Sequence, residues 1–366
     1  MRDNYFEPSF GNRPRNLVGR ESHLRKFEMA LESKPASRDR AMLVLGQRGY
    51  GKTVLLLEMA DIARERGFIV ASPTVVAPGM LERIIEKLNY EAAPYLKKEK
   101  AKVTGGNVSV LGFGAGVQFQ EQGDETRSFA FRLSALCREL DKKDCGVLIL
   151  IDEVQANNEE LKQLIIAYQE IVGEGGNIAV VIAGLPGAIS TTLNEKVLTF
   201  LNRASKSELT PLNEKDIYAY YKNTFKKIGI GITDDMCRDA ASETDGSPYM
   251  MQLLGHYIVS YCDEGGTCDE KTYAEALSDS RIDYINDIAK TTINTLSAKD
   301  VEFLTAMLPD DDTSRISDIS ERMGVSSAYA QLYKRRLVDA GVIEKAGRGE
   351  VRMTMPSIRD YLKMQE

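Results

Sequence analysis

The sequence contains no tryptophan and only two histidines among its 366 residues. Its five cysteines are odd in number and show no Cys-x-x-Cys pair, so the sequence indicates neither a disulfide framework nor a zinc site. We therefore expect reduced thiols. We interpret the two histidines as surface or packing residues rather than metal ligands.

Long apolar stretches are also missing. A run of about 18 apolar residues, which a membrane-spanning helix needs, does not occur, so we expect no membrane partner. The opening residues MRDNYFEPSFGNRPRN contain no apolar signal core, so we expect a cytoplasmic protein. The formal net charge of −7 argues against a protein that coats nucleic acid over its whole surface, but it does not tell where charge is clustered.

The stretch LGQRGYGKT, residues 45–53, has the spacing of a phosphate-binding loop. An apolar strand precedes it and the helix-forming run TVLLLEMADIARERG follows it, which is the context that this loop requires. Lys52 is expected to reach the β- and γ-phosphates of ATP, and the Thr53 hydroxyl is expected on Mg²⁺. The residues that we expect to contact the nucleotide are Gly46, Gln47, Arg48, Gly49, Tyr50, Gly51, Lys52, Thr53 and Val54.

A second strand with a terminal carboxylate follows about a hundred residues later, in GVLILIDEVQ, residues 146–155. Its uninterrupted apolar run predicts a central strand of a parallel sheet, and ligands collect at the carboxyl ends of such strands. Asp152 is therefore a candidate Mg²⁺ ligand together with Thr53. Glu153 is the candidate base that positions the attacking water. The alternative is that both carboxylates only cap the next helix.

The length predicts two or three domains. Strands and helices alternate over residues 1–205, which predicts an α/β fold with a parallel sheet covered by helices on both faces. Alternating β-type residues broken by glycines predict an inserted hairpin at about 98–122. Residues 206–292 have only helical patterns and predict a helical lid, and residues 293–366 predict a winged helix-turn-helix.

The last segment predicts three short helices and a hairpin. In SAYAQLYKRRLVDAG, residues 327–341, three positions at helical spacing should face the core, while Ser327, Gln331, Lys334 and Arg335 should point outward as in a recognition helix. Arg348 lies at the expected tip of the hairpin, or wing. Over residues 331–352 six cations oppose three carboxylates, so a local charge of +3 predicts modest, salt-sensitive binding to double-stranded DNA. Docking of a protein partner is the open alternative.

These stretches, together with NLVGRE at 16–21 and Gly-Ser-Pro at 246–248, resemble the AAA+/STAND group of P-loop ATPases. The chain is most similar to bacterial ATP-binding proteins related to the origin-recognition initiator ATPases. The resemblance implies that Val18, Gly19 and Arg20 flank the adenine and ribose and that Pro248 closes over the base. It also implies that Arg203 is a trans-acting or sensing arginine, with an ordinary surface arginine as the alternative.

Two departures from that pattern bear on the mechanism. The strand NIAVVIAGLPG ends in Ala183 and Gly184, where such ATPases carry a polar or basic sensor, and no arginine follows Gly-Ser-Pro in the lid. Each missing contact to the developing phosphoryl charge costs on the order of a hundredfold in rate, so we expect slow ATP hydrolysis. The sequence thus predicts a switch ATPase that binds ATP, assembles when ATP bridges subunits, and acts through its winged helix. The alternative is a signalling ATPase whose winged helix docks a protein.

Overall fold

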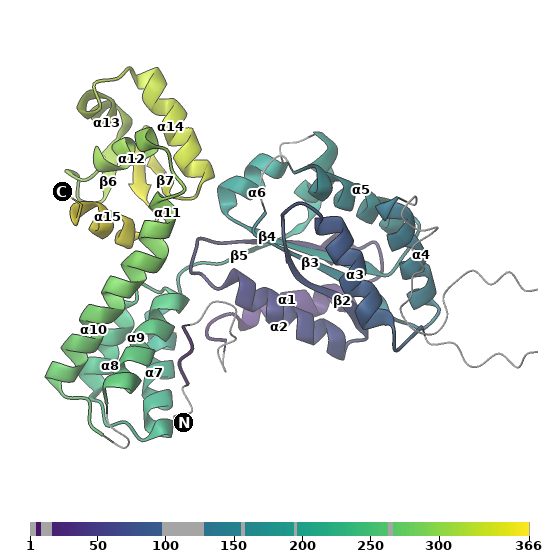
Figure 1. Ribbon diagram of the computed structural model, residues 1–366, viewed down its shortest axis with the longest axis horizontal. Coiled ribbons are helices and arrows are strands. Elements are labelled where there is room, and N and C mark those ends of the chain that lie inside the picture. Colours follow the sequence, from purple (N-terminus) through teal and green to yellow (C-terminus); the bar gives the residue numbers. More distant parts are fainter. Residues whose placement is uncertain are drawn as a thin grey trace, which may run out of the picture.

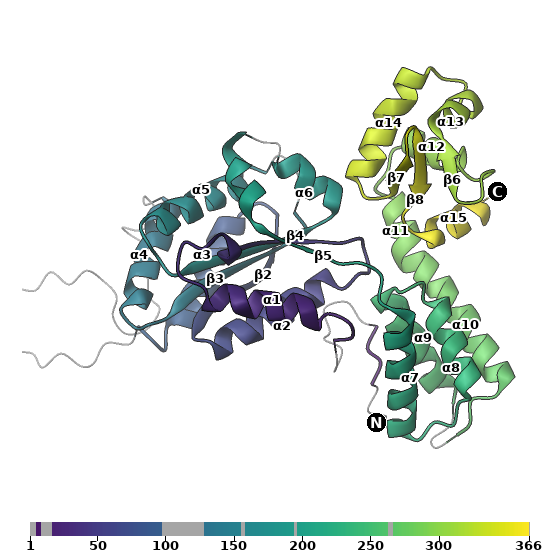
Figure 2. The ribbon, with the colours of Figure 1, turned by 180° about the vertical axis from the view of Figure 1, so that it is seen from behind.

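The computed structural model describes residues 5–8, 17–96, 128–154, 158–193, 196–262 and 266–365. The predicted hairpin at 98–122 lies outside these residues. Figures 1 and 2 show three parts: a sheet with helices on both faces, and, on one side of it, a helical bundle and a smaller C-terminal part that lie one above the other. None of the helices in the described ranges is long and apolar enough to cross a membrane.

The first part is built on a five-stranded parallel sheet in the order β2-β3-β4-β1-β5. Its strands are β1 (Ala41–Leu45), β2 (Phe68–Val75), β3 (Gly146–Asp152), β4 (Ile178–Gly184) and β5 (Ser205–Glu208). Every residue of β1, β3 and β4 is buried, as the uninterrupted apolar runs predict for strands covered on both faces. The predicted α/β fold class is confirmed.

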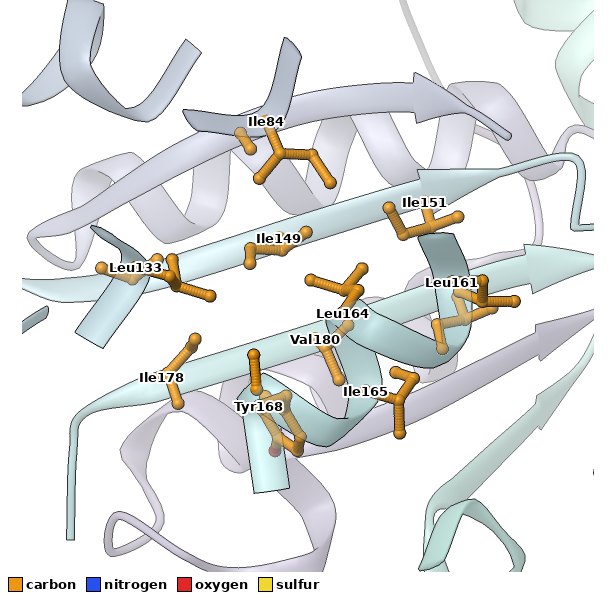
Figure 3. Close-up of a cluster of buried hydrophobic side chains, with 14 of the residues drawn as sticks. Ile84, Leu133, Ile149, Ile151, Leu161, Leu164, Ile165, Tyr168, Ile178 and Val180 are labelled. Atoms are coloured by element: carbon orange, nitrogen blue, oxygen red, sulfur yellow. The ribbon is translucent and has the colours of Figure 1, made fainter. Parts of the chain in front are cut away.

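Helices cover both faces of this sheet. They are α1 (Glu21–Glu32), α2 (Lys52–Glu65), α3 (Met80–Ala92), α4 (Phe129–Asp141), α5 (Glu159–Gly173) and α6 (Pro186–Leu193), with 3-10 helices η1 (Arg38–Arg40) and η2 (Lys196–Arg203). Alternate strand residues divide into two cores: one packs with α1 and α2, and the other packs with α3, α4 and α5. Figure 3 shows the second core, where Ile84 of α3, Leu133 of α4 and Leu164 of α5 meet Ile149 of β3.

The helical bundle, which we call the lid, follows β5. It contains α7 (Glu214–Ile228), α8 (Asp234–Glu243), α9 (Pro248–Tyr261) and α10 (Glu270–Tyr284), and it continues through the π-helix η3 (Ile285–Lys290) into α11 (Thr291–Ile293). Each of α7, α8, α9 and α10 begins after an Asn, Thr, Ser or Asp whose side chain accepts a hydrogen bond from the first turn. The lid has its own core of aromatic and aliphatic side chains.

The last part, which we call the C-terminal unit, comprises residues 298–365. Its elements are α12 (Ala298–Thr305), β6 (Thr313–Arg315), α13 (Ile316–Arg322), α14 (Ser327–Asp339), β7 (Ile343–Gly347), β8 (Glu350–Met353) and α15 (Pro356–Lys363). The three strands form an antiparallel sheet in the order β6-β8-β7, and β6 is an addition to the predicted helices and hairpin. Ile285 and Ile288 of η3 belong to its core, so one continuous helical segment joins the lid to this unit.

Candidate nucleotide-binding site and surrounding contacts

The loop between β1 and α2 lies at the carboxyl edge of the parallel sheet. Gly49 and Gly51 have φ of +78° and +81°, a left-handed conformation that glycine adopts without strain. A Cβ at Gly51 would meet no atom within 4 Å, so its requirement for glycine is conformational. The backbone therefore turns as an anion-binding loop must, directly before the N-terminus of α2.

The side chain of Lys52 folds back over this loop. Its Nζ donates hydrogen bonds to the carbonyl oxygens of Gly46, at 2.9 Å, and Gln47, at 2.8 Å. Burial lowers the pKa of this amine to about 8, while the nearby carboxylates of Asp152 and Glu153 act in the opposite direction. A phosphate bound at the loop would supply the negative partner that this buried ammonium lacks.

Thr53 and Asp152 meet although they are far apart in the sequence. The Thr53 hydroxyl donates to Asp152 Oδ2 at 2.6 Å, and the Glu153 N–H donates to Asp152 Oδ1 at 3.0 Å. The Asp152 side chain is buried at the end of β3, so a hydroxyl and a carboxylate converge beside the phosphate loop. Hard oxygen donors of this kind fit Mg²⁺, which keeps few protein ligands and takes the rest from phosphates and water.

Glu153 has φ of +53°, a left-handed backbone conformation that is uncommon for residues other than glycine. The following Val154 N–H donates to Ala183 O at 3.1 Å, which fixes this turn against β4. Backbone strain of this kind costs about 1–3 kcal/mol and is typical of functional sites. The turn leaves the Glu153 side chain exposed beside Asp152.

The segment that precedes α1 joins the loop to the lid. Arg20 is 4% exposed, and its Nη2 donates to Thr210 O at 2.9 Å and to Tyr50 O at 3.3 Å. Burial lowers the pKa of its guanidinium. Val18 packs against the lid core, and Gly19 has φ of +65° beside Leu212. Arg20 thus connects the phosphate loop with the segment between β5 and α7 that leads into the lid.

The beginning of α9 faces the phosphate loop. A Cβ at Gly49 would lie 3.7 Å from Ser247 Oγ and 3.8 Å from both Tyr249 Cβ and Ile288 Cδ1. Pro248 is the first residue of α9, and Ser247 caps this helix by accepting from Met250 N–H. The structure thus brings the start of α9, which includes Pro248, next to the loop residues.

The C-terminal unit also touches this region, which the sequence did not predict. A Cβ at Gly341 would lie 2.7 Å from Gln47 Oε1, and a Cβ at Gly187 would lie 2.3 Å from the Cα and carbonyl oxygen of Asp339. Gln47 Oε1 is buried and has no hydrogen-bond partner in the described part of the chain. The end of α14 therefore packs on α6, and the turn after it packs on the phosphate loop. In the sequence, the glycines at positions 187 and 341 were the only indication of these contacts.

Arg203 is not brought to the phosphate loop. It precedes β5, and the β1–β5 register pairs Met42 with Ser205, so Arg203 lies near the amino ends of the strands. Gly46 lies about six residues farther along the strand direction, or roughly 20 Å at 3.3 Å per residue. Arg203 is exposed and lines a cavity of about 300 Å³ with Gln169, Thr199 and Phe200. The phosphate loop of the same chain is therefore out of reach of the Arg203 side chain.

The candidate DNA-binding residues lie on one part of the C-terminal unit. Ser327, Gln331 and Arg335 are exposed on α14, Lys334 is half-buried, and Arg348 is exposed at the β7–β8 turn. Two large hydrophobic side chains are also exposed on α14, Tyr329 at 39% and Leu332 at 53%, and the sequence pattern did not indicate them.

Ion pairs reduce the positive charge that α14 and the β7–β8 hairpin can offer to DNA. Arg336 pairs with Asp300 at 2.8 Å, and Arg352 pairs with Glu344. Of the six cations counted in the sequence, Lys334, Arg335, Lys345 and Arg348 have no ion pair within the described residues.

Comparison with known families identifies the class of the first part. Residues 16–181 match the model of the AAA ATPase domain, so the chain carries an AAA ATPase domain. Residues 286–362 match a domain of unknown function (DUF8462). No curated protein matches the chain in sequence.

Solved structures share the fold over nearly the whole length of the chain. The Walker-type ATPase PABY2304 of Pyrococcus abyssi is 16% identical, with a TM-score of 0.68 and coverage of 96% of this chain and 97% of that chain. The Aeropyrum pernix ORC2 protein, in its ADPNP–ADP complexes, is 14% identical, with a TM-score of 0.65 and coverage of 98% and 97%. The resemblance to origin-recognition ATPases is confirmed at the level of the fold.

Proposed function

We propose that this chain is a slowly hydrolysing ATP switch whose C-terminal unit is a winged helix-turn-helix that binds double-stranded DNA. The observation that supports a switch most directly is the position of the phosphate loop. Its residues lie against the C-terminal unit, the lid and the helix that joins them: Gln47 against Gly341 of the C-terminal unit, and Gly49 against both α9 of the lid and Ile288 of η3. A nucleotide at this loop would alter contacts of all three.

In this proposal each residue of the site has a separate role. Lys52 and the loop N–H groups hold the phosphates, and Thr53 and Asp152 hold Mg²⁺. Mg²⁺ would neutralise charge that develops on the phosphates. Glu153, exposed beside Asp152, orients the attacking water. The buried Ala183 at the end of β4 offers no charge to the γ-phosphate, which supports slow turnover.

Assembly through ATP is the further part of the proposal. Arg203 lies too far from its own phosphate loop and is exposed at the surface, so we propose that it reaches the nucleotide of a neighbouring subunit. A guanidinium placed at a γ-phosphate stabilises the charge of the transition state. Hydrolysis would then depend on contact between subunits.

The DNA-binding proposal is tested by fluorescence anisotropy of a labelled mixed-sequence duplex, with and without ATP, at several salt concentrations. The four cations that have no ion pair within the described residues predict a slope of log affinity against log salt no steeper than about −3.6 per bound chain. Arg335→Ala or Arg348→Ala should lower the magnitude of this slope by about 1. Arg138→Ala is the charge-matched control, because Arg138 pairs with Glu174 on the ATPase part.

Protein docking is the second candidate, and the exposed Tyr329 and Leu332 on α14 favour it. Large apolar side chains at the surface are typical of protein interfaces, whereas a groove of DNA is contacted mainly by polar and cationic groups. Absence of duplex binding at low salt in both nucleotide states would reject the DNA proposal. Loss of partner binding in a Leu332→Ser variant would then support docking.

A further inference from the structure

The N-terminal residues 5–8 lie on the lid, apart from the sheet. Figures 1 and 2 both show this short segment running beside α7. Phe6 is fully buried within the lid core. Its ring centroid lies 5.3 Å from that of Phe225, 5.7 Å from that of Tyr220 and 5.9 Å from that of Tyr221. We call residues 5–8 the arm.

Gly255 provides the space for the Phe6 ring. It lies inside α9, where glycine is less favourable than alanine. A Cβ at this position would lie 2.2 Å from Phe6 Cδ1 and 2.6 Å from Phe6 Cγ, so the ring rests directly on the helix backbone. The groove between α7 and α9 is therefore shaped for an aromatic side chain.

The residues on either side of Phe6 are also recognised. The Glu7 N–H donates to Gln252 Oε1 at 3.1 Å, and the Tyr220 hydroxyl donates to Tyr5 O at 3.2 Å. The Lys227 ammonium lies 5.0 Å from the centre of the Tyr5 ring. A buried aromatic anchor flanked by hydrogen bonds to the main chain is the usual way in which a groove binds a peptide.

These partners of the arm all belong to α7 and α9, whereas the next described residue, Leu17, packs against the core of α1 and α2. The recognised contacts thus do not depend on the ATPase part that follows the arm in the same chain. We propose that the groove is a peptide-docking site that also takes the arm of a second copy of this chain. Exchange of an identical element preserves every contact and is a low-cost route to assembly.

Exchange must compete with the chain's own arm. A tethered segment acts at an effective concentration of the order of millimolar, so dilute protein keeps its own arm docked. Exchange therefore becomes populated when the protein is concentrated or when another interface holds two copies together. This inference is independent of nucleotide and DNA binding.

Two cysteine variants test exchange directly. Glu7→Cys and Gln252→Cys keep the Phe6 anchor and replace two neighbouring residues, because the Glu7 N–H donates to Gln252 Oε1 at 3.1 Å, so the two introduced thiols lie close to each other when the arm is docked. The two single variants, carrying different tags, are mixed under mild oxidation. A covalent heterodimer can form only between two chains, and its yield should rise with protein concentration.

The controls use the same substitutions. Each single variant alone reports background from the five native cysteines, which are all buried. The double variant in one chain should close an internal disulfide and shows that the geometry permits the bond. An internal disulfide in the double variant, with no heterodimer at concentrations of hundreds of micromolar in the mixture, would overturn exchange.

A labelled peptide covering residues 4–9, NYFEPS, provides a second measurement on the full-length Phe6→Ala protein. We expect saturable binding that is at least roughly tenfold weaker for the NYAEPS peptide, because the aromatic anchor carries most of the recognition. Gly255→Leu, added to the same protein, should abolish binding by filling the groove. Equal binding of the two peptides, or no binding, would reject the docking site.

Discussion

The contact between α6 and α14 predicts that Gly187→Ala separates the C-terminal unit from the ATPase part. The new Cβ would lie 2.3 Å from the Cα and carbonyl oxygen of Asp339, which are backbone atoms that no rotamer change can move. Overpacking of this kind costs about 1–3 kcal/mol. The equilibrium between the docked and separated arrangements should therefore shift by about 5-fold to 140-fold toward separation.

Amide hydrogen exchange measures this shift without a probe attached to the protein. Residues 185–193 and 336–342 should exchange faster together in the Gly187→Ala protein, because opening exposes both sides of the contact. Gly173→Ala is the matched control, since a Cβ at Gly173 at the end of α5 would meet no atom within 4 Å. If only α6 exchanges faster, or if neither segment changes, the contact is not a docking interface and the reasoning fails.

Other predictions concern the candidate nucleotide site. Lys52→Ala should abolish ATP binding in calorimetry, because its amine is the group placed over the phosphate loop; unchanged affinity would contradict that role. Glu153→Gln should bind ATP but stall single-turnover hydrolysis, and a normal rate would mean that another group orients the water. Arg203→Ala should poison the wild-type ATPase in mixed assemblies, whereas independent activities would make it a local residue. The pKa of Lys52, lowered by burial to about 8, predicts that ATP binding at pH 8.5–9 takes up a proton as the phosphates restore the ammonium; calorimetry in buffers of different ionisation enthalpy measures this uptake, and heats independent of buffer would count against it.

The same pKa shift bears on stability without nucleotide, with a definite sign. Between pH 8 and 10.5 the unfolded chain keeps the Lys52 proton longer than the folded chain does. The unfolded state then binds more protons, so this group's contribution to stability increases as pH rises through that window. The buried Lys52 ammonium therefore destabilises the nucleotide-free protein at neutral pH. Binding of phosphates would offset this cost by pairing the ammonium with negative charge.

Local patterns made much of the ATPase part predictable. Uninterrupted apolar runs identified β1, β3 and β4 because strands covered on both faces have no polar side to alternate. The glycines of 46–51 identified the loop because its left-handed turns exclude most other residues. By contrast, β5 and β6 were missed: SKSE and TSR are short and polar, and neighbouring strands hold them in place.

The contacts between parts could not be derived in this way. Gly187 follows a Leu-Pro turn and Gly341 ends a helix, so each looks like an ordinary local glycine in the sequence. Gly341 does have φ of +67°, which a local turn requires, but Gly187 has no such conformation to account for it. Its requirement arises because the backbone of Asp339, about 150 residues later, lies against it. A glycine with no local conformational reason is therefore the residue to examine first for coupling between the nucleotide loop and the C-terminal unit.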